Sequence, residues 1–176
     1  MFFPKLADLL HRRHCRPTLG RAKADQRWRP TLITGFGTEE EYVDEFLANF
    51  RARDENARDF ALKNRVLLIY DSSGIPFDIA LGGLPFEERT MERASPWRVG
   101  SGQTLITCSA EDSIIHKAVA ARYIDWADIE RVLMRQIKRL NVDLIFKELC
   151  PLLELKEAPE IEDRLRKMME KEKLEN

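Results

Sequence analysis

The stretch RVLLIYDSSGIPFDIALGG, residues 65–83, predicts the centre of the fold. Two apolar runs, 65–70 and 75–81, flank Asp-Ser-Ser-Gly at 71–74, which ends in the glycine that such turns prefer. This pattern predicts a β-hairpin. Alternation along its second strand places the large apolar side chains on one face and Asp78, among small residues, on the other. A lone acid there suits a ligand-facing strand and equally a solvent-facing one, so its role stays open at this point.

The other segments predict one more hairpin and a series of helices. Apolar residues at helical spacing mark the helices, and Thr38 and the pattern Ser109-x-x-Asp112 are start signals. The order of helix, strand, helix, two hairpins and a helical block is typical of an α+β fold with a small mixed or antiparallel sheet. We expect helices over 4–14, 38–53, 56–64, 109–122, 125–140, 142–155 (interrupted near Pro151) and 159–176, and strands over 31–36, 97–100 and 103–108.

The composition is that of a soluble globular chain, with 44% hydrophobic and 34% charged residues among 176. This length suits one domain with a short helical appendage. The net charge of -1 predicts no general attraction to nucleic acid or membrane, and no apolar run approaches the ~20 residues of a membrane span. Three cysteines without a CxxC motif predict a reducing compartment, no structural disulfide and no zinc site. We therefore expect a cytoplasmic protein without a membrane partner.

The positive charge is concentrated at the start of the sequence. Residues 1–30 carry eight Lys and Arg against two acids, so residues 31–176 have a net charge of -7. Such asymmetry often marks an interaction tail. Residues 15–30 show no periodicity of either kind, and we expect the segment to be irregular or disordered.

Lys117 is a second candidate site residue, at the edge of the apolar stripe of its predicted helix. It could contact a phosphate as a point charge, or it could simply extend its ammonium group to solvent. Asp125 as N-cap and Asp128 in the first turn of the next helix have a sufficient structural explanation. Glu87 and Glu88 follow a strand, where they could supplement a metal site or face water.

Two segments, FDIALGGLPFEE at 77–88 and CSAEDSIIHKAVAARYIDWADIE at 108–130, carry a resemblance to a known family. With the sequence around them, residues 31–155 resemble the nucleotidyltransferase-like proteins of the AbiEii/AbiGii toxin type, relatives of the minimal nucleotidyltransferases. The resemblance implies a polymerase-β-like palm, a mixed sheet with a helical C-terminal block. It also implies three regions: an atypical basic segment 1–30, the nucleotidyltransferase-like domain 31–155, and a charged C-terminal helix over 156–176.

In this family, three acids hold Mg²⁺ ions that bind a nucleoside triphosphate and align the attacking hydroxyl. The reaction that the resemblance implies is transfer of a nucleotide to a hydroxyl of RNA, such as tRNA, or of a protein. An antitoxin is the implied partner. By match, Asp78 is the third acid, a catalytic residue and metal ligand, and Lys117 faces the nucleotide.

The sequence departs from the family at the other two acids, an Asp-x-Asp pair expected near positions 27 and 29. Arg27 and Arg29 stand there, so we expect Mg²⁺ binding to be weak or lost and the enzymatic activity to be impaired. We interpret the first ~30 residues as a truncated or frame-shifted replacement of the family's catalytic start. The arginines could instead attract phosphate. The alternative function is a non-catalytic binding or partner-docking module of a toxin–antitoxin system.

Overall fold

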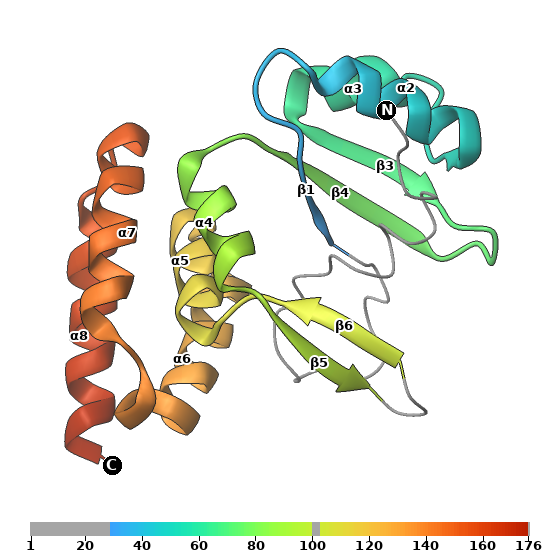
Figure 1. The fold of residues 1–176 in the computed structure, drawn as a ribbon. Helices are drawn as coiled ribbons and strands as arrows, with labels where there is room; N and C mark the ends of the chain where they lie inside the picture. The colour runs from blue at the N-terminus through green and yellow to red at the C-terminus, as the bar shows by residue number, and fades with distance from the viewer. Residues whose placement is uncertain (1–28, 100–102, 176) are drawn as a thin grey trace. The chain divides into compact units, whose positions relative to one another are not determined.

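The computed structural model describes residues 29–99 and 103–175, shown as coloured ribbon in Figure 1. The predicted helix 4–14 and Arg27 lie outside the described residues. The chain divides between Cys108 and Ser109 into two units, and each is described by itself below.

The first unit is built on a four-stranded sheet in the order β1-β4-β3-β2. β3 and β4 form the predicted hairpin, with Leu68 opposite Asp78, and β1 runs parallel to β4. The sheet is therefore mixed, which confirms the α+β class, while the polymerase-β-like palm stays a prediction. The strands of this sheet are β1 (Thr31–Ile33), β2 (Arg51–Ala52), β3 (Val66–Tyr70) and β4 (Pro76–Gly82).

One face of this sheet is covered by two helices, α2 (Glu39–Asn49) and α3 (Ala57–Asn64), as Figure 1 shows. Strand alternation is as predicted, because the residues on either side of Asp78 are buried while Asp78 faces the other way. The core between sheet and helices consists of Leu32, Val43, Phe46, Ala61, Leu67, Ile69, Phe77, Ile79 and Leu81.

The predicted helix 38–53 is wrong at its C-terminal end. α2 stops at Asn49, Phe50 is extended (φ -130°, ψ 148°), and Arg51 pairs with Tyr70 as part of β2. Pairing with the edge of the sheet overrides the helical tendency of these residues, as tertiary contacts commonly do. This change matters for the site, because it puts the residues after the helix onto the period of a strand.

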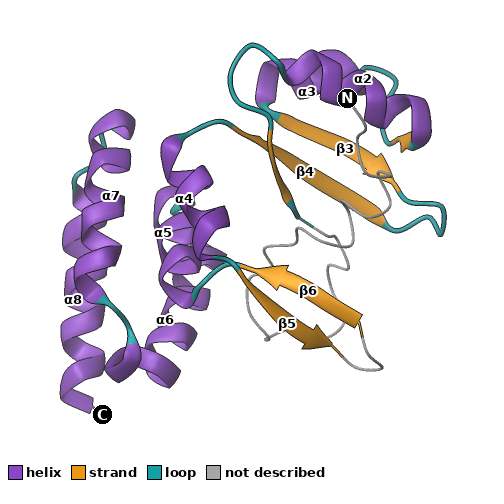
Figure 2. Ribbon diagram, in the orientation of Figure 1, coloured by secondary structure: helices purple, strands orange, loops and turns teal. Residues whose placement is uncertain are grey.

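The rest of the first unit consists of a helix that the sequence reading missed and the second predicted hairpin. α4 (Pro85–Arg93) begins with proline in its first turn, a recognised helix-start signal. β5 (Ser95–Val99) and β6 (Gln103–Thr107) form an antiparallel pair, close to the predicted bounds (Figure 2). Cys108 is disulfide-bonded, so the expectation of no structural disulfide is wrong, while Cys150 is a free thiol.

The second unit is helical and has its own core. Ser109 caps its first helix as predicted, since its Oγ accepts from the Asp112 backbone N at 3.0 Å. The expected interruption near Pro151 is wrong, because Pro151 lies inside a continuous helix whose Leu149 and Leu153 are buried. Packing of this kind offsets the ~3 kcal/mol that proline costs in a helix interior. The elements are α5 (Ala110–Ala120), α6 (Tyr123–Gln136), the 3₁₀ helix η1 (Ile137–Arg139), α7 (Val142–Lys156) and α8 (Glu160–Glu175).

In the part of the chain that the structure describes, every helix is too short or too polar to cross a membrane. The prediction of a cytoplasmic protein stays a prediction.

Candidate functional site

Asp78 lies in the middle of β4, on the sheet face that α2 and α3 do not cover. Its side chain is half-buried, with 16% of its surface exposed. The register of the strands places Leu68 of β3 directly opposite it. A carboxylate this far from bulk water requires compensation by hydrogen bonds or opposite charge.

Two arginines supply that compensation. The Nη1 of Arg53 donates to Oδ1 of Asp78, and the Nε of Arg29 lies 3.7 Å from Oδ2. The Arg53 side chain is 18% exposed, whereas that of Arg29 is 47% exposed. We call these three residues the Asp78 clamp. Because each oxygen faces a guanidinium group, Asp78 acts in this structure as the counter-ion of two cations.

The local backbone explains why Arg53 reaches Asp78. Arg51 lies opposite Tyr70, and the Arg53 backbone N donates to the Leu68 carbonyl at 3.1 Å, so the strand geometry continues past β2. Alternation then puts Arg51 and Arg53 on one face of the sheet. The guanidinium carbon of Arg51 lies 4.3 Å from the centroid of the Tyr70 ring, and that of Arg53 lies 5.9 Å from it.

The clamp does not fit the Mg²⁺ site that the resemblance implies. Such a site needs several oxygen ligands around each ion, and the family uses three acids. Within residues 29–99 and 103–175, no group of three or more His, Cys, Asp or Glu side chains is arranged to hold a metal ion. A cation at Asp78 would also have to displace Arg53 and Arg29 from the same two oxygens.

Lys117, the other predicted site residue, belongs to the second unit and lies in α5. It is only 8% exposed, and its Nζ lies 2.6 Å from Asp128 Oδ2 and 3.9 Å from Asp125 Oδ1. Lys117 therefore does not extend to solvent, and its charge is already paired within its own unit. Its predicted contact with a nucleotide stays a prediction.

The prediction that Asp125 is the N-cap of α6 is wrong. The helix starts at Tyr123 with Arg122 as N-cap, and Asp125 accepts from the Arg122 backbone N at 3.2 Å and side-chain Nε at 2.6 Å. Burial raises the pKa of Asp125. The hydrogen bonds and charge of Arg122 and the charge of Lys117 together outweigh burial, so the pKa lies below its usual value. Asp125 is thus a structural anion that joins α6 to Lys117 of α5.

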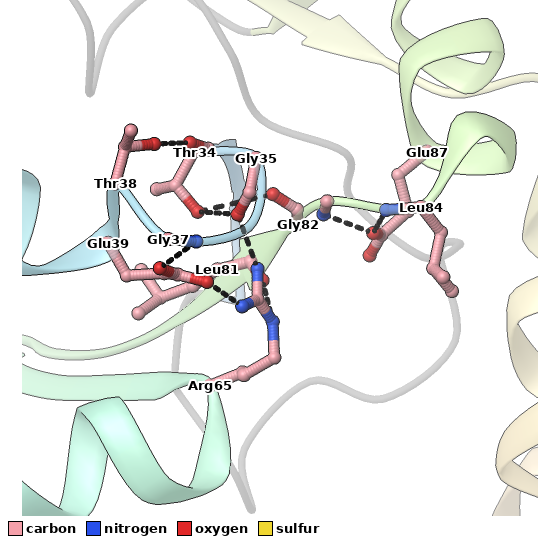
Figure 3. A network of polar contacts seen from close by, with 11 residues as sticks. Thr34, Gly35, Gly37, Thr38, Glu39, Arg65, Leu81, Gly82, Leu84 and Glu87 are labelled. Carbon is pink, nitrogen blue, oxygen red and sulfur yellow. Dashed lines mark hydrogen bonds and ion pairs between the residues drawn. The ribbon is translucent and has the colours of Figure 1, made fainter.

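Glu87 also has a structural role, at the start of α4. Its Oε2 accepts from the backbone N of Gly83 at 2.8 Å and of Leu84 at 2.9 Å, at the start of α4 (Figure 3). Glu39 does the same at the start of α2, where its Oε2 accepts from Gly37 N at 2.7 Å. Glu88 is exposed. At both helix starts, an acid of the helix itself therefore accepts from backbone N–H groups just before the helix.

Arg65 links the loop that follows β1 to the end of β4 (Figure 3). Its Nε donates to the Leu81 carbonyl and its Nη2 to the Gly35 carbonyl, both at 2.9 Å, and its Nη1 donates to Glu39. The predicted Thr38 cap is replaced as well, because the Thr38 hydroxyl donates to the Thr34 carbonyl. This network fixes the chain where β1 and β4 end.

Sequence reasoning missed Arg53, Arg51 and Tyr70 as neighbours of Asp78. The spacing Arg51-x-Arg53 was a usable signal, since it puts two cations on one face of a strand. Reading these residues as helix removed that signal. The sequence indicates Arg29 only as the residue that stands in place of an acid of the expected Asp-x-Asp pair.

The comparisons with known proteins give no family for the chain. No protein-family model matches it, and a search of curated proteins found no similar one.

Proposed function

We propose that this chain is a nucleotidyltransferase-like protein that binds the phosphate chain of a nucleoside triphosphate at the Asp78 clamp and does not itself transfer the nucleotide. The observation that carries the proposal is the pairing of both Asp78 oxygens with guanidinium groups. The resemblance of residues 31–155 to nucleotidyltransferases supports the choice of ligand.

Charge explains why the clamp favours phosphate over a metal. The clamp itself consists of two guanidinium groups and one carboxylate. A Mg²⁺ ion would be repelled by both cations, whereas phosphate oxygens are attracted to them. Arginine offers several donors in a planar fork that matches phosphate geometry.

The three residues have different roles in this proposal. Asp78 holds Arg53 against the sheet, while its negative charge competes with an arriving anion for the same guanidinium group. Arg29 is nearly half exposed and lies farther from Asp78, so a phosphate can reach its guanidinium group from solvent. No step of nucleotide transfer is assigned to Asp78.

Binding of ATP, measured by calorimetry with EDTA in place of Mg²⁺, tests the proposal. We expect binding to persist without Mg²⁺ and to strengthen roughly fivefold in Asp78→Asn, because removal of one negative charge frees about 1 kcal/mol of attraction. Asp59→Asn is the control, since Asp59 is an exposed acid of the same unit. It should leave the affinity unchanged.

A nucleotide-transfer assay can contradict the proposed function. The protein is incubated with Mg²⁺, labelled nucleoside triphosphates and tRNA, and we expect no labelled product. Labelling of tRNA or of the protein that disappears in Asp78→Asn would show that Asp78 is a working metal ligand, and would overturn the proposal.

A further inference from the structure

A depression of about 480 Å³ opens beside the clamp, at the ends of β2 and β3. This volume is in the range of small-molecule sites. Tyr70 connects the two places, because it is one of the residues that line the depression and its ring centroid lies 5.9 Å from the guanidinium carbon of Arg53. The polar residues that line it and matter here are Asn49, Arg51, Tyr70, Asp71, Ser72 and Ser73.

Arg51 contributes a guanidinium group to the lining of this depression. Its guanidinium group lies over the Tyr70 ring at 4.3 Å, and it forms no ion pair with the described residues. A guanidinium plane that rests on one aromatic ring can accept a second ring on its other face. Nucleic-acid bases stack in this way on arginine and tyrosine side chains.

Asp71 provides an acceptor whose position is fixed by the turn. Its Oδ1 accepts from the backbone N of Ser73 at 2.8 Å and of Ile75 at 2.7 Å. Its Oδ2 and the hydroxyl of Ser72 make no side-chain hydrogen bond within the described residues. A carboxylate fixed in this way is suited to accept from the hydroxyl groups of a ribose, as acids do in dinucleotide sites.

Charge distinguishes the depression from the clamp. Arg51 and Asp71 balance each other, so the depression is neutral, while the clamp presents two guanidinium groups. A neutral, aromatic and hydroxyl-rich lining suits a nucleoside better than a phosphate chain. Tyr70 and Asp78 are diagonal neighbours on paired strands, which places their Cβ atoms about 7–8 Å apart. A single nucleotide bridges that separation.

We infer that this depression is the nucleoside subsite of the nucleotide whose phosphates bind at the Asp78 clamp, with the base on Arg51 and the ribose at Asp71. The inference rests on the proposed function, because it takes the ligand from there. It adds the part of the ligand that the clamp does not contact.

A comparison of two ligands distinguishes binding at the subsite from binding at the clamp. Calorimetry on the full chain compares ATP with tripolyphosphate, which lacks the nucleoside. Arg51→Ala is expected to weaken ATP binding roughly tenfold and to change tripolyphosphate binding by less than about twofold. Asp71→Asn, which keeps the turn acceptor, is expected to weaken ATP but not 2′,3′-dideoxy-ATP. Arg58→Ala is the control, because Arg58 is an exposed arginine that pairs with Asp44 and does not line the depression.

The outcomes are distinguishable. Equal weakening of ATP and tripolyphosphate by Arg51→Ala would make Arg51 a phosphate contact and overturn the subsite, while the proposed function would stand. Absence of binding by both ligands would overturn the proposed function, and adenosine then decides the subsite. Adenosine binding that Arg51→Ala abolishes would support the subsite alone, and no adenosine binding would overturn it. Thermal melting of each variant confirms that it is folded.

Discussion

At the scale of single residues, Asp78 shows how the neighbours of a carboxylate decide its chemistry. An acid beside other acids attracts a metal ion, whereas an acid between Arg53 and Arg29 is neutralised. The side-chain alternation of the strand predicted which face Asp78 occupies. It could not predict the partners, because Arg53 arrives from a segment 25 residues earlier in the chain.

Removal of the Lys117 ammonium group should lower the stability of the second unit. Lys117→Met keeps the volume but leaves Asp128 and Asp125 without their shared cation. Because Arg131 and Arg122 still pair with these acids, we expect a loss of about 1–3 kcal/mol in the free energy of unfolding, measured in urea. Lys117→Arg should lose less. A neutral effect of Lys117→Met would show that the buried ammonium contributes nothing net.

Asp125 should make the protein sensitive to acid. Its pKa in the folded protein is below its usual value, although burial opposes this, because Arg122 and Lys117 stabilise the carboxylate. Its contribution to stability is therefore complete above the unfolded pKa of about 4 and is lost as the pH falls through the folded pKa.

The measurement is the free energy of unfolding of the wild type and Asp125→Asn between pH 7 and pH 2.5. The difference between them should be largest near neutral pH and shrink below about pH 4. Asparagine can still accept from the Arg122 backbone N, so the helix cap is retained. A difference that does not change with pH would contradict the role of the charge.

At the scale of elements, the loops after β1 and β4 depend on a close backbone approach at Gly83. A Cβ at this position would lie 3.0 Å from the carbonyl carbon and oxygen of Gly35 and from Nη2 of Arg65. We expect Gly83→Ala to lower the free energy of unfolding by about 1–3 kcal/mol, because backbone atoms cannot move aside. Thermal melting measures the effect.

Gly74 offers a comparison with a different physical cause. It has a φ of +81°, and a Cβ at this position would meet open space, since no atom lies within 4 Å of it. Gly74→Ala should therefore lower the free energy of unfolding by about 1 kcal/mol, the penalty of a left-handed conformation for alanine. Equal costs at both positions would mean that crowding at Gly83 is relieved by small shifts.

The elements also show why part of the site escaped prediction. Residues 38–53 have continuous helical periodicity, and nothing local marks the change to strand after Asn49. That change depends on the β3 edge, a partner distant in sequence, and it sets which way Arg51 and Arg53 face. The hairpin of β3 and β4 was predictable because its turn and both strands are contiguous.

At the scale of the whole molecule, the α+β class followed from the order of segments, but the division after Cys108 did not. The resemblance treats residues 31–155 as one domain. In the structure, each unit buries its own apolar residues, and periodicity within a segment cannot tell which segments share a core. The buried set of the second unit includes Ile115, Leu133 and Leu165, from three different helices.

A core of its own predicts that the second unit folds alone. A fragment of residues 109–176 should be helical by circular dichroism and should melt cooperatively, because α5, α6, α7 and α8 bury apolar faces against one another. Leu133→Ala, at a fully buried position, should lower the melting temperature of the fragment, since such changes cost about 2–5 kcal/mol. Met134→Ala, at an exposed neighbour, should change it little. A fragment that is unfolded, or that melts without cooperativity, would mean that the helices depend on the first unit for their stability, and that the division after Cys108 is not a division in folding.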